Sequence, residues 1–324
     1  MDRRQVLVLM AGTAGPLPLF AQDLTPARPL PFCLRSRFWM NLHHVLAELV
    51  QADSEMADWR QPQGWSEADA QAWRAAQQTY REAFAEADVP FDERFQALRL
   101  ALLGLADAQP LPSLAPTLHP FGLALEQAAG PYRRHLWSRH AALNESWILQ
   151  ARPLLVRHGR VLRDRLEAAL QPALPELIPV DVVAHAGNFA GAYTHPGPAH
   201  TVMPSTRRSY QGDASLEMLF HEASHTGMDS RLIRDIDALL APRGLKDKRG
   251  LWHATQFFTV GHLTRQVLAE ASRAYEPYAQ RWRVLERTWS FAIAPLAVHW
   301  QPYLDGRRPR DEALAALVSA AYPA

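Results

Sequence analysis

The pentapeptide His221-Glu222-Ala223-Ser224-His225 constrains the fold more than any other feature of the chain. Apolar residues precede and enter it at helical spacing: Leu216, Leu219, Phe220 and Ala223. Asp213 is placed to cap such a helix. Positions four apart differ by only about 40° around a helix and ~6 Å along it, so both histidines can offer imidazoles to one metal ion. Glu222 lies on the neighbouring edge, where it can take a proton from a water molecule instead of binding the metal. The pattern predicts a zinc site, because zinc accepts tetrahedral nitrogen and oxygen ligands.

The segments before this helix predict a small sheet within a mostly helical chain. Short β-branched runs bounded by Pro and Gly indicate strands at 179–184, 191–194 and 200–204. Helical periodicity covers most of the rest, at 36–58, 66–87, 92–106, 131–150, 153–172 and 249–272. We therefore expect a predominantly α-helical α+β fold. In it a helical N-terminal region (22–175) precedes a region (176–324) that holds the sheet, the motif helix and the C-terminal helices.

Residues 1–21 have the features of an export signal. Arg3 and Arg4 precede the apolar run Val6–Leu9, as in a twin-arginine signal, and Ala21 offers a small residue for cleavage. The apolar stretch from Val6 to Ala21 contains two prolines and is too short for a comfortable bilayer span. We expect a bacterial protein that is periplasmic or secreted, with no stable membrane span after cleavage.

Charge and cysteine content exclude several classes of protein. The chain has 34 basic and 33 acidic residues and a formal net charge of +1, so it has no global electrostatic attraction to nucleic acid. It contains one cysteine, Cys33, which rules out an intrachain disulfide and predicts a free thiol.

Strands followed by the run Leu216–His225 resemble the gluzincin branch of the zinc metallopeptidases, and within it exported bacterial proteins of that type. The resemblance covers roughly residues 180–270. It implies a zincin-like C-terminal half in which His221 and His225 bind one Zn²⁺ per chain and Glu222 is the general base. It also implies an edge strand that pairs with an extended peptide, and we expect this to be His200–Pro204.

The resemblance further implies a third ligand, usually a glutamate, from the next long helix. From the family pattern we expect a carboxylate residue directly after Gly261, but the residue at that position is His262. We expect His262 to be the third ligand, since a neutral imidazole also binds zinc. Glu270 and His253 are the alternatives, and His253 lies about 180° around the helix from His262, so one ion does not easily take both.

Other residues near the motif have less specific expectations. Glu217 stands eight residues, or ~12 Å, from His225, which excludes it from joining both histidines and favours a contact with His221. Tyr193 and His200 lie next to the expected edge strand and are candidates for contacts with the substrate or its oxyanion. Packing and ordinary hydrogen bonding are the alternative for both.

These features favour an exported zinc-dependent metallopeptidase that hydrolyses peptide bonds of a peptide or protein substrate with zinc-activated water. One alternative is a degenerate peptidase-like protein that binds metal or peptides without cutting them, which the His262 departure motivates. Another is a helical scaffold without metal.

Overall fold

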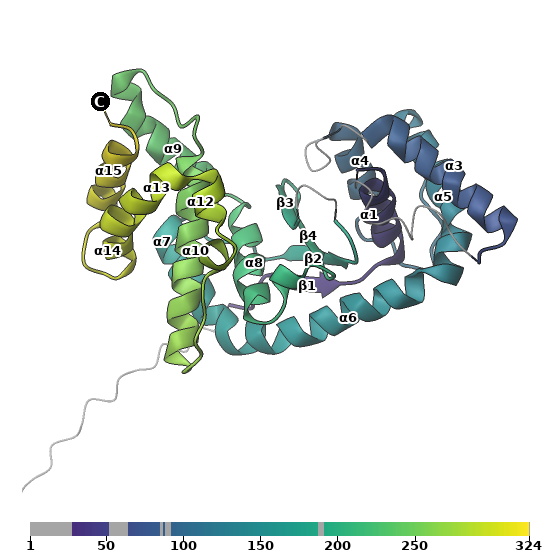
Figure 1. Cartoon of the computed structure of the whole chain (residues 1–324), viewed down its shortest axis with the longest axis horizontal. Coiled ribbons are helices and arrows are strands. Elements are labelled where there is room, and N and C mark those ends of the chain that lie inside the picture. Colours follow the sequence, from purple (N-terminus) through teal and green to yellow (C-terminus); the bar gives the residue numbers. More distant parts are fainter. Residues whose placement is uncertain (1–27, 52–63, 85–86, 88–91, 187–190, 324) are drawn as a thin grey trace, which may run out of the picture.

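A four-stranded mixed sheet lies between two groups of helices in the computed structural model, which describes residues 28–51, 64–84, 87, 92–186 and 191–323 (Figure 1). The expected export signal at 1–21 and the end of the helix expected at 36–58 lie outside these residues. The sheet has the strand order β1-β2-β4-β3, from β1 (Phe32–Arg35), β2 (Ile178–Val183), β3 (Tyr193–Pro196) and β4 (Ala199–Pro204). β2 pairs parallel with both β1 and β4, and β3 pairs antiparallel with β4.

The three strands expected from the sequence are confirmed, but the expected edge strand is wrong. β4 lies inside the sheet between β2 and β3, so the segment His200–Pro204 has no free edge. The tight turn at Gly197 and Pro198 folds β3 back onto the outer side of β4, which makes β3 the edge. The other edge, β1, is only four residues long and was not expected from the sequence; it contains Cys33, a free thiol.

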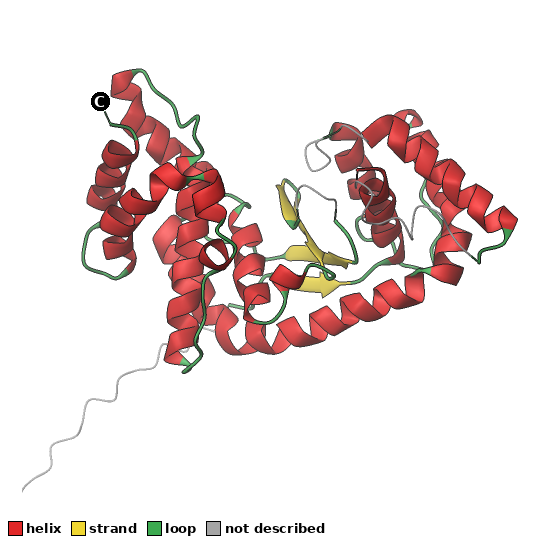
Figure 2. Ribbon diagram, in the orientation of Figure 1, coloured by secondary structure: helices red, strands yellow, loops and turns green. Residues whose placement is uncertain are grey.

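Helices make up most of the described chain, which confirms the predominantly α-helical α+β class (Figure 2). Before the second strand they are α1 (Phe38–Gln51), α3 (Glu67–Phe84), α4 (Glu93–Leu102), α5 (His119–His135), α6 (Trp137–Leu154) and α7 (Arg160–Leu170). After the sheet they are α8 (Asp213–Ser224), α9 (Met228–Leu240), α10 (Leu251–Glu270), α11 (Tyr278–Arg281), α12 (Val284–Thr288), α13 (Ser290–Pro295), α14 (Gln301–Leu304) and α15 (Arg310–Ala321).

Helix boundaries differ from the sequence expectation around α5 and α6. The helix expected at 131–150 spans two helices, because the chain breaks at Leu136 between α5 and α6. The helix expected to begin at Pro153 instead continues α6 through a π-helical segment, Leu155–Gly159, into α7. Proline has no amide hydrogen and removes one helical hydrogen bond, which a wider local turn accommodates.

Two hydrophobic cores lie on opposite faces of the sheet. One is formed by α1, α3, α4 and α5 and includes Tyr193 and Val202 from the sheet. The other is formed by α6 to α15 and includes Val182 and Met203. The expected boundary at 175/176 does not separate these cores, since β1 pairs with β2 and α6 and α7 belong to the second core. α6 runs along the sheet from one helix group to the other (Figure 1).

We find no helix among the described residues with both the length and the apolar character that crossing a membrane requires.

Candidate metal centre

α8 presents both histidines of the motif on one side, as its sequence predicts. Leu216, Leu219 and Phe220 are buried in the second core, which turns the motif toward the sheet and α10. His225 follows the last residue of α8 and keeps a right-handed helical conformation, so the four-residue spacing is preserved. The ring centroids of His221 and His225 are 5.1 Å apart.

His253, in the first turn of α10, completes a cluster of three imidazoles. Its ring centroid lies 5.5 Å from that of His221 and 5.2 Å from that of His225. One ring nitrogen from each histidine lies within 4.8 Å of the other two. Nitrogens bound to one zinc ion at ~2.1 Å are roughly 3.4 Å apart in tetrahedral geometry, so small side-chain rotations bring all three into range.

The start of α10 holds His253 in place. Asp247 accepts hydrogen bonds from the amides of Leu251 and Trp252 and so caps the helix. Gly250 precedes it with φ +73°, and a Cβ there would lie 2.9 Å from the indole nitrogen of Trp289. The Trp289 ring in turn packs against His253, with the centroids 4.9 Å apart. The third imidazole therefore comes from a capped, well-packed first turn.

His262 is not part of this cluster, so the structure does not place the expected third ligand beside His221 and His225. It lies on the opposite side of α10, where its Nε2 donates to Asp305 at 2.8 Å and its ring stacks on Phe258. Glu270, the second alternative, stands at the far end of α10 and forms a salt bridge with Arg165. The structure thus brings together His221, His225 and His253.

Glu222 is buried beside the cluster and is held by the sheet. Its Oε2 accepts a hydrogen bond from Thr194 Oγ1 at 3.0 Å, and the Thr194 hydroxyl also contacts that of Thr201. Burial raises the pKa of Glu222, and His225 and Thr194 oppose that shift. Thr194 is not among the site residues expected from the sequence, although side chains alternate along β3 and Thr194 therefore faces the opposite side of the sheet from Tyr193.

Burial favours the neutral form of His221 and His253, in which one ring nitrogen carries a free lone pair, and a hydrogen bond orients His225. Asp229 contacts Nδ1 of His225 at 3.2 Å, which leaves Nε2 as the nitrogen of that ring without a hydrogen-bond partner among the described residues. Nδ1 of His221 and Nε2 of His253 are buried and have no hydrogen-bond partner in the described part of the chain. Burial lowers the pKa of His221 far below its ordinary value and that of His253 to about 3, with neighbouring imidazoles adding to both shifts. Neutral imidazoles with unpartnered ring nitrogens have the chemistry that metal binding requires.

Tyr193 and His200 lie on the other face of the sheet, so neither is a contact residue of the cluster. The Tyr193 hydroxyl bonds Nε2 of His44 at 2.8 Å in the first core. His200 is fully buried in β4, where its Nε2 donates to Asp181 at 2.7 Å and its Nδ1 contacts Arg99. The packing alternative applies to both residues.

Glu217 does not contact His221 through a hydrogen bond but fixes a neighbouring segment of chain to α8. Its Oε2 accepts from the hydroxyl of Tyr275 at 2.7 Å and from the amide of Tyr278 at 3.0 Å. Gly261 gives the carboxyl room, since a Cβ there would lie 3.1 Å from Glu217 Oε1. Burial raises the pKa of Glu217 from 4.5 to about 7, although these two hydrogen bonds oppose the shift.

This raised pKa predicts a pH-dependent stability. The folded chain keeps the Glu217 proton until about pH 7, whereas the unfolded chain loses it near pH 4.5, so stability falls as the pH rises through that window. We expect the unfolding free energy of Glu217→Gln minus that of the wild type to increase by about 2–3 kcal/mol between pH 5 and pH 8. Urea unfolding of both proteins in chelator at the two pH values measures it, and parallel pH profiles would contradict it.

Comparisons with known proteins identify no relative. No protein-family model matches the chain, and neither the curated proteins nor the solved structures give a significant match.

Proposed function

We propose that the protein is a zinc-dependent peptidase that holds one Zn²⁺ through His221, His225 and His253. The observation that carries the proposal is the convergence of three imidazoles from α8 and α10 with Glu222 beside them. We also propose that it acts outside the cytoplasm, on the basis of the twin-arginine-like segment at 1–21.

The donor set suits zinc better than harder cations. Imidazole nitrogens are ligands that zinc prefers, whereas magnesium and calcium select oxygen. Three protein ligands leave a fourth position free, as in catalytic rather than structural zinc sites. When bound, zinc supplies Lewis-acid activation of a carbonyl and makes a nearby water more acidic.

Glu222 is the proposed general base. Thr194 occupies its Oε2, while Oε1 has no hydrogen-bond partner among the residues that the structure describes and is left to accept a proton from water. The hydrogen bond from Thr194 also fixes the orientation of the carboxylate relative to the imidazoles. A base held in one orientation transfers protons more effectively than a mobile one.

A peptide is the substrate class that the sheet favours. β3 is an edge strand, so its outer side has backbone groups without a strand partner among the described residues. An extended peptide can add to such an edge through main-chain hydrogen bonds. Because Thr194 in β3 contacts Glu222, a peptide bound there would carry its carbonyls past the base.

A metal- or peptide-binding protein without hydrolytic activity is the second candidate function. Its support is the donor set, in which the third residue is an imidazole, that of His253, whereas the gluzincin resemblance implies a carboxylate. Hydrolysis of a diverse peptide library by the zinc-loaded protein distinguishes the two candidates. We expect turnover that stops in chelator and returns with added zinc, and no turnover under any metal loading would favour the second candidate.

Asp229 gives a more local test of the metal site. Asp229→Asn weakens the contact that orients His225, and outer-shell changes of this kind typically cost 10–100-fold in metal affinity. We expect a loss of about that size for zinc, measured by competition with a chromophoric chelator. Asp235→Asn is the matched control, because Asp235 also lies on α9 but pairs with Arg231 and Arg310. Equal affinities of the two variants would contradict the orienting role.

A further inference from the structure

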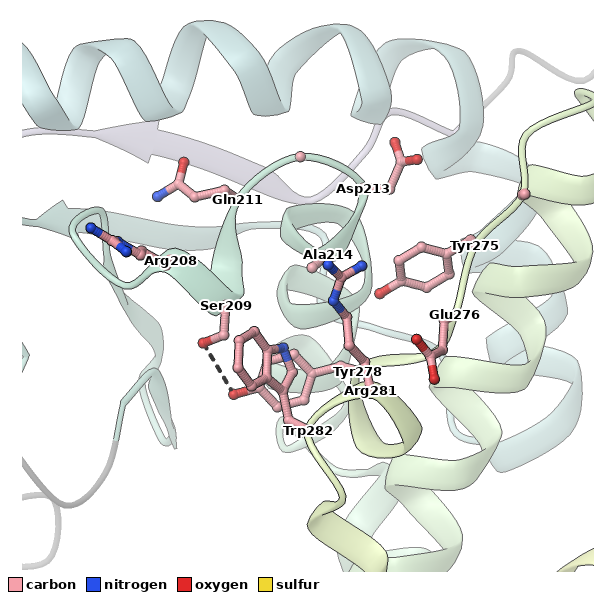
Figure 3. A pocket seen from close by; sticks show the side chains of 12 residues that line it. Arg208, Ser209, Gln211, Asp213, Ala214, Tyr275, Glu276, Tyr278, Arg281 and Trp282 are labelled. Atoms are coloured by element: carbon pink, nitrogen blue, oxygen red, sulfur yellow. Dashed lines mark hydrogen bonds between the residues drawn. The ribbon is translucent and has the colours of Figure 1, made fainter.

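A cavity of about 420 Å³ lies beside the first turn of α8 (Figure 3). His221 and His225 lie at the other end of that helix. One wall is the segment 208–214 that leads into α8, and the other is the segment 274–282 that contains α11. Cavities that hold small ligands span ~300–1,000 Å³. The space is therefore large enough for a whole residue of a peptide.

Aromatic side chains line the second wall, and hydrogen bonds anchor two of these residues, Tyr275 and Tyr278. Tyr275 and Tyr278 are both tied to the buried Glu217, and the Tyr278 hydroxyl also donates to Ser209 on the facing wall. Trp282 remains 42% exposed at the rim. Because the wall is anchored before any ligand arrives, binding requires little ordering of these side chains.

Two arginines, Arg208 and Arg281, and two carboxylates, Asp213 and Glu276, line the cavity, and cations exceed anions by one once Arg273, the partner of Asp213, is counted. Neither Arg208 nor Arg281 has a hydrogen-bond or ion-pair partner for its guanidinium within the described ranges, whereas Asp213 is already paired with Arg273 at 2.6 Å. Glu276 is the remaining exposed carboxylate, so two free cations face one anion.

Arg281 is the better placed of the two free cations. Figure 3 shows its guanidinium between Ala214 and Tyr275, whereas Arg208 lies at the opposite end, beside Gln211. A planar guanidinium matches the two oxygens of a carboxylate.

A chain of contacts between aromatic rings runs from the cavity to the imidazole cluster. The Tyr278 ring stacks on Phe257 with centroids 6.1 Å apart, and Phe257 packs on His221 at 3.8 Å. Asp213 and Glu222 are nine residues apart on α8, which is ~13 Å along the helix axis. An extended peptide covers that distance with about four residues at ~3.3 Å each.

We propose that this cavity binds a carboxylate of the peptide substrate, about four residues from the hydrolysed bond, with Arg281 as the main cation. The inference rests on the proposed function, because it assigns the second contact point to a peptide that lies across Glu222. The carboxylate comes from the C-terminus of the peptide or from an Asp or Glu side chain. Both have the same chemistry, and the experiment separates them.

Binding of three six-residue peptides to the full mature chain carrying Glu222→Gln tests the proposal without turnover. One peptide has a free C-terminus and no acidic side chain, the second is its C-terminal amide, and the third is that amide with one glutamate at the sixth position. Titration calorimetry with and without chelator gives the affinities. We expect one or both carboxylate peptides to bind about tenfold more tightly than the neutral amide, a ratio that corresponds to ~1.4 kcal/mol.

Arg281→Gln is expected to remove this preference, whereas the control Arg287→Gln, an exposed arginine on α12 outside the cavity, is expected to keep it. Equal binding of all three peptides, or a preference that survives Arg281→Gln, would overturn the proposal. Its failure is distinguishable from that of the proposed function, because zinc-dependent hydrolysis by the wild type is measured separately. If the protein prefers carboxylate peptides through Arg281 but hydrolyses none, the carboxylate site is supported and the peptidase proposal is contradicted.

Discussion

Replacing Glu222 with glutamine is expected to abolish peptide hydrolysis and to leave the zinc content of the protein unchanged. Glutamine retains an oxygen that accepts the hydrogen bond from Thr194 but has no basic oxygen to take a proton from water. Loss of a positioned general base typically costs 10²–10⁴-fold in rate, and we expect a fall of about that size in kcat. The side chain is buried, and glutamine has nearly the same size and shape as glutamate, so the replacement preserves the packing.

The measurement is kcat on the best peptide from the library, together with elemental zinc in the same samples. Glu286→Gln, an exposed glutamate on α12, is the matched control and is expected to keep both values. Wild-type turnover by Glu222→Gln would remove this residue from the mechanism. Loss of zinc together with activity would show that Glu222 maintains the metal site, and would leave its role as base unsupported.

Replacing His253 with alanine is expected to cost more zinc affinity than any change outside the cluster. It removes one of three imidazoles, so the loss should exceed the 10–100-fold that outer-shell substitutions cause. His262→Ala is the matched control, because it removes an imidazole from the same helix on the opposite side, where the ring bonds Asp305. We expect this variant to bind zinc with wild-type affinity.

Competition with a chromophoric chelator measures both variants, and circular dichroism checks that each remains folded. The reverse result, with His262→Ala losing zinc and His253→Ala keeping it, would mean that α10 turns its other side to α8. It would restore the ligand set that the sequence analysis favours.

The sequence predicts the two ligands on α8 but not which histidine of α10 joins them. The spacing of four residues in the motif on α8 places both of its histidines on one side, because helix geometry is fixed. α10 is different, since it is buried on nearly all sides and has no single apolar stripe to tell which side faces α8. The sequence correctly places His253 and His262 on opposite sides of one helix, but the packing of α10 against α8 decides between them.

The sheet gives a second example. β-branched runs predict its last three strands, yet the strand order depends on long-range pairing of β1 with β2, which no local pattern encodes. As a result β4 was expected at the edge and Tyr193 near the cluster. In a strand, a shift of one residue changes the face, and Thr194 is the residue that faces Glu222.

Zinc per chain tests the central claim most directly. The chain without residues 1–21 is purified without a histidine tag or chelator and analysed for its metal content, next to His225→Ala prepared in the same way. The proposed centre predicts about one zinc ion per wild-type chain and a sharp fall in the variant. Absence of zinc from the wild type, even after zinc is offered at neutral pH, would contradict the metal centre and the peptidase proposal with it.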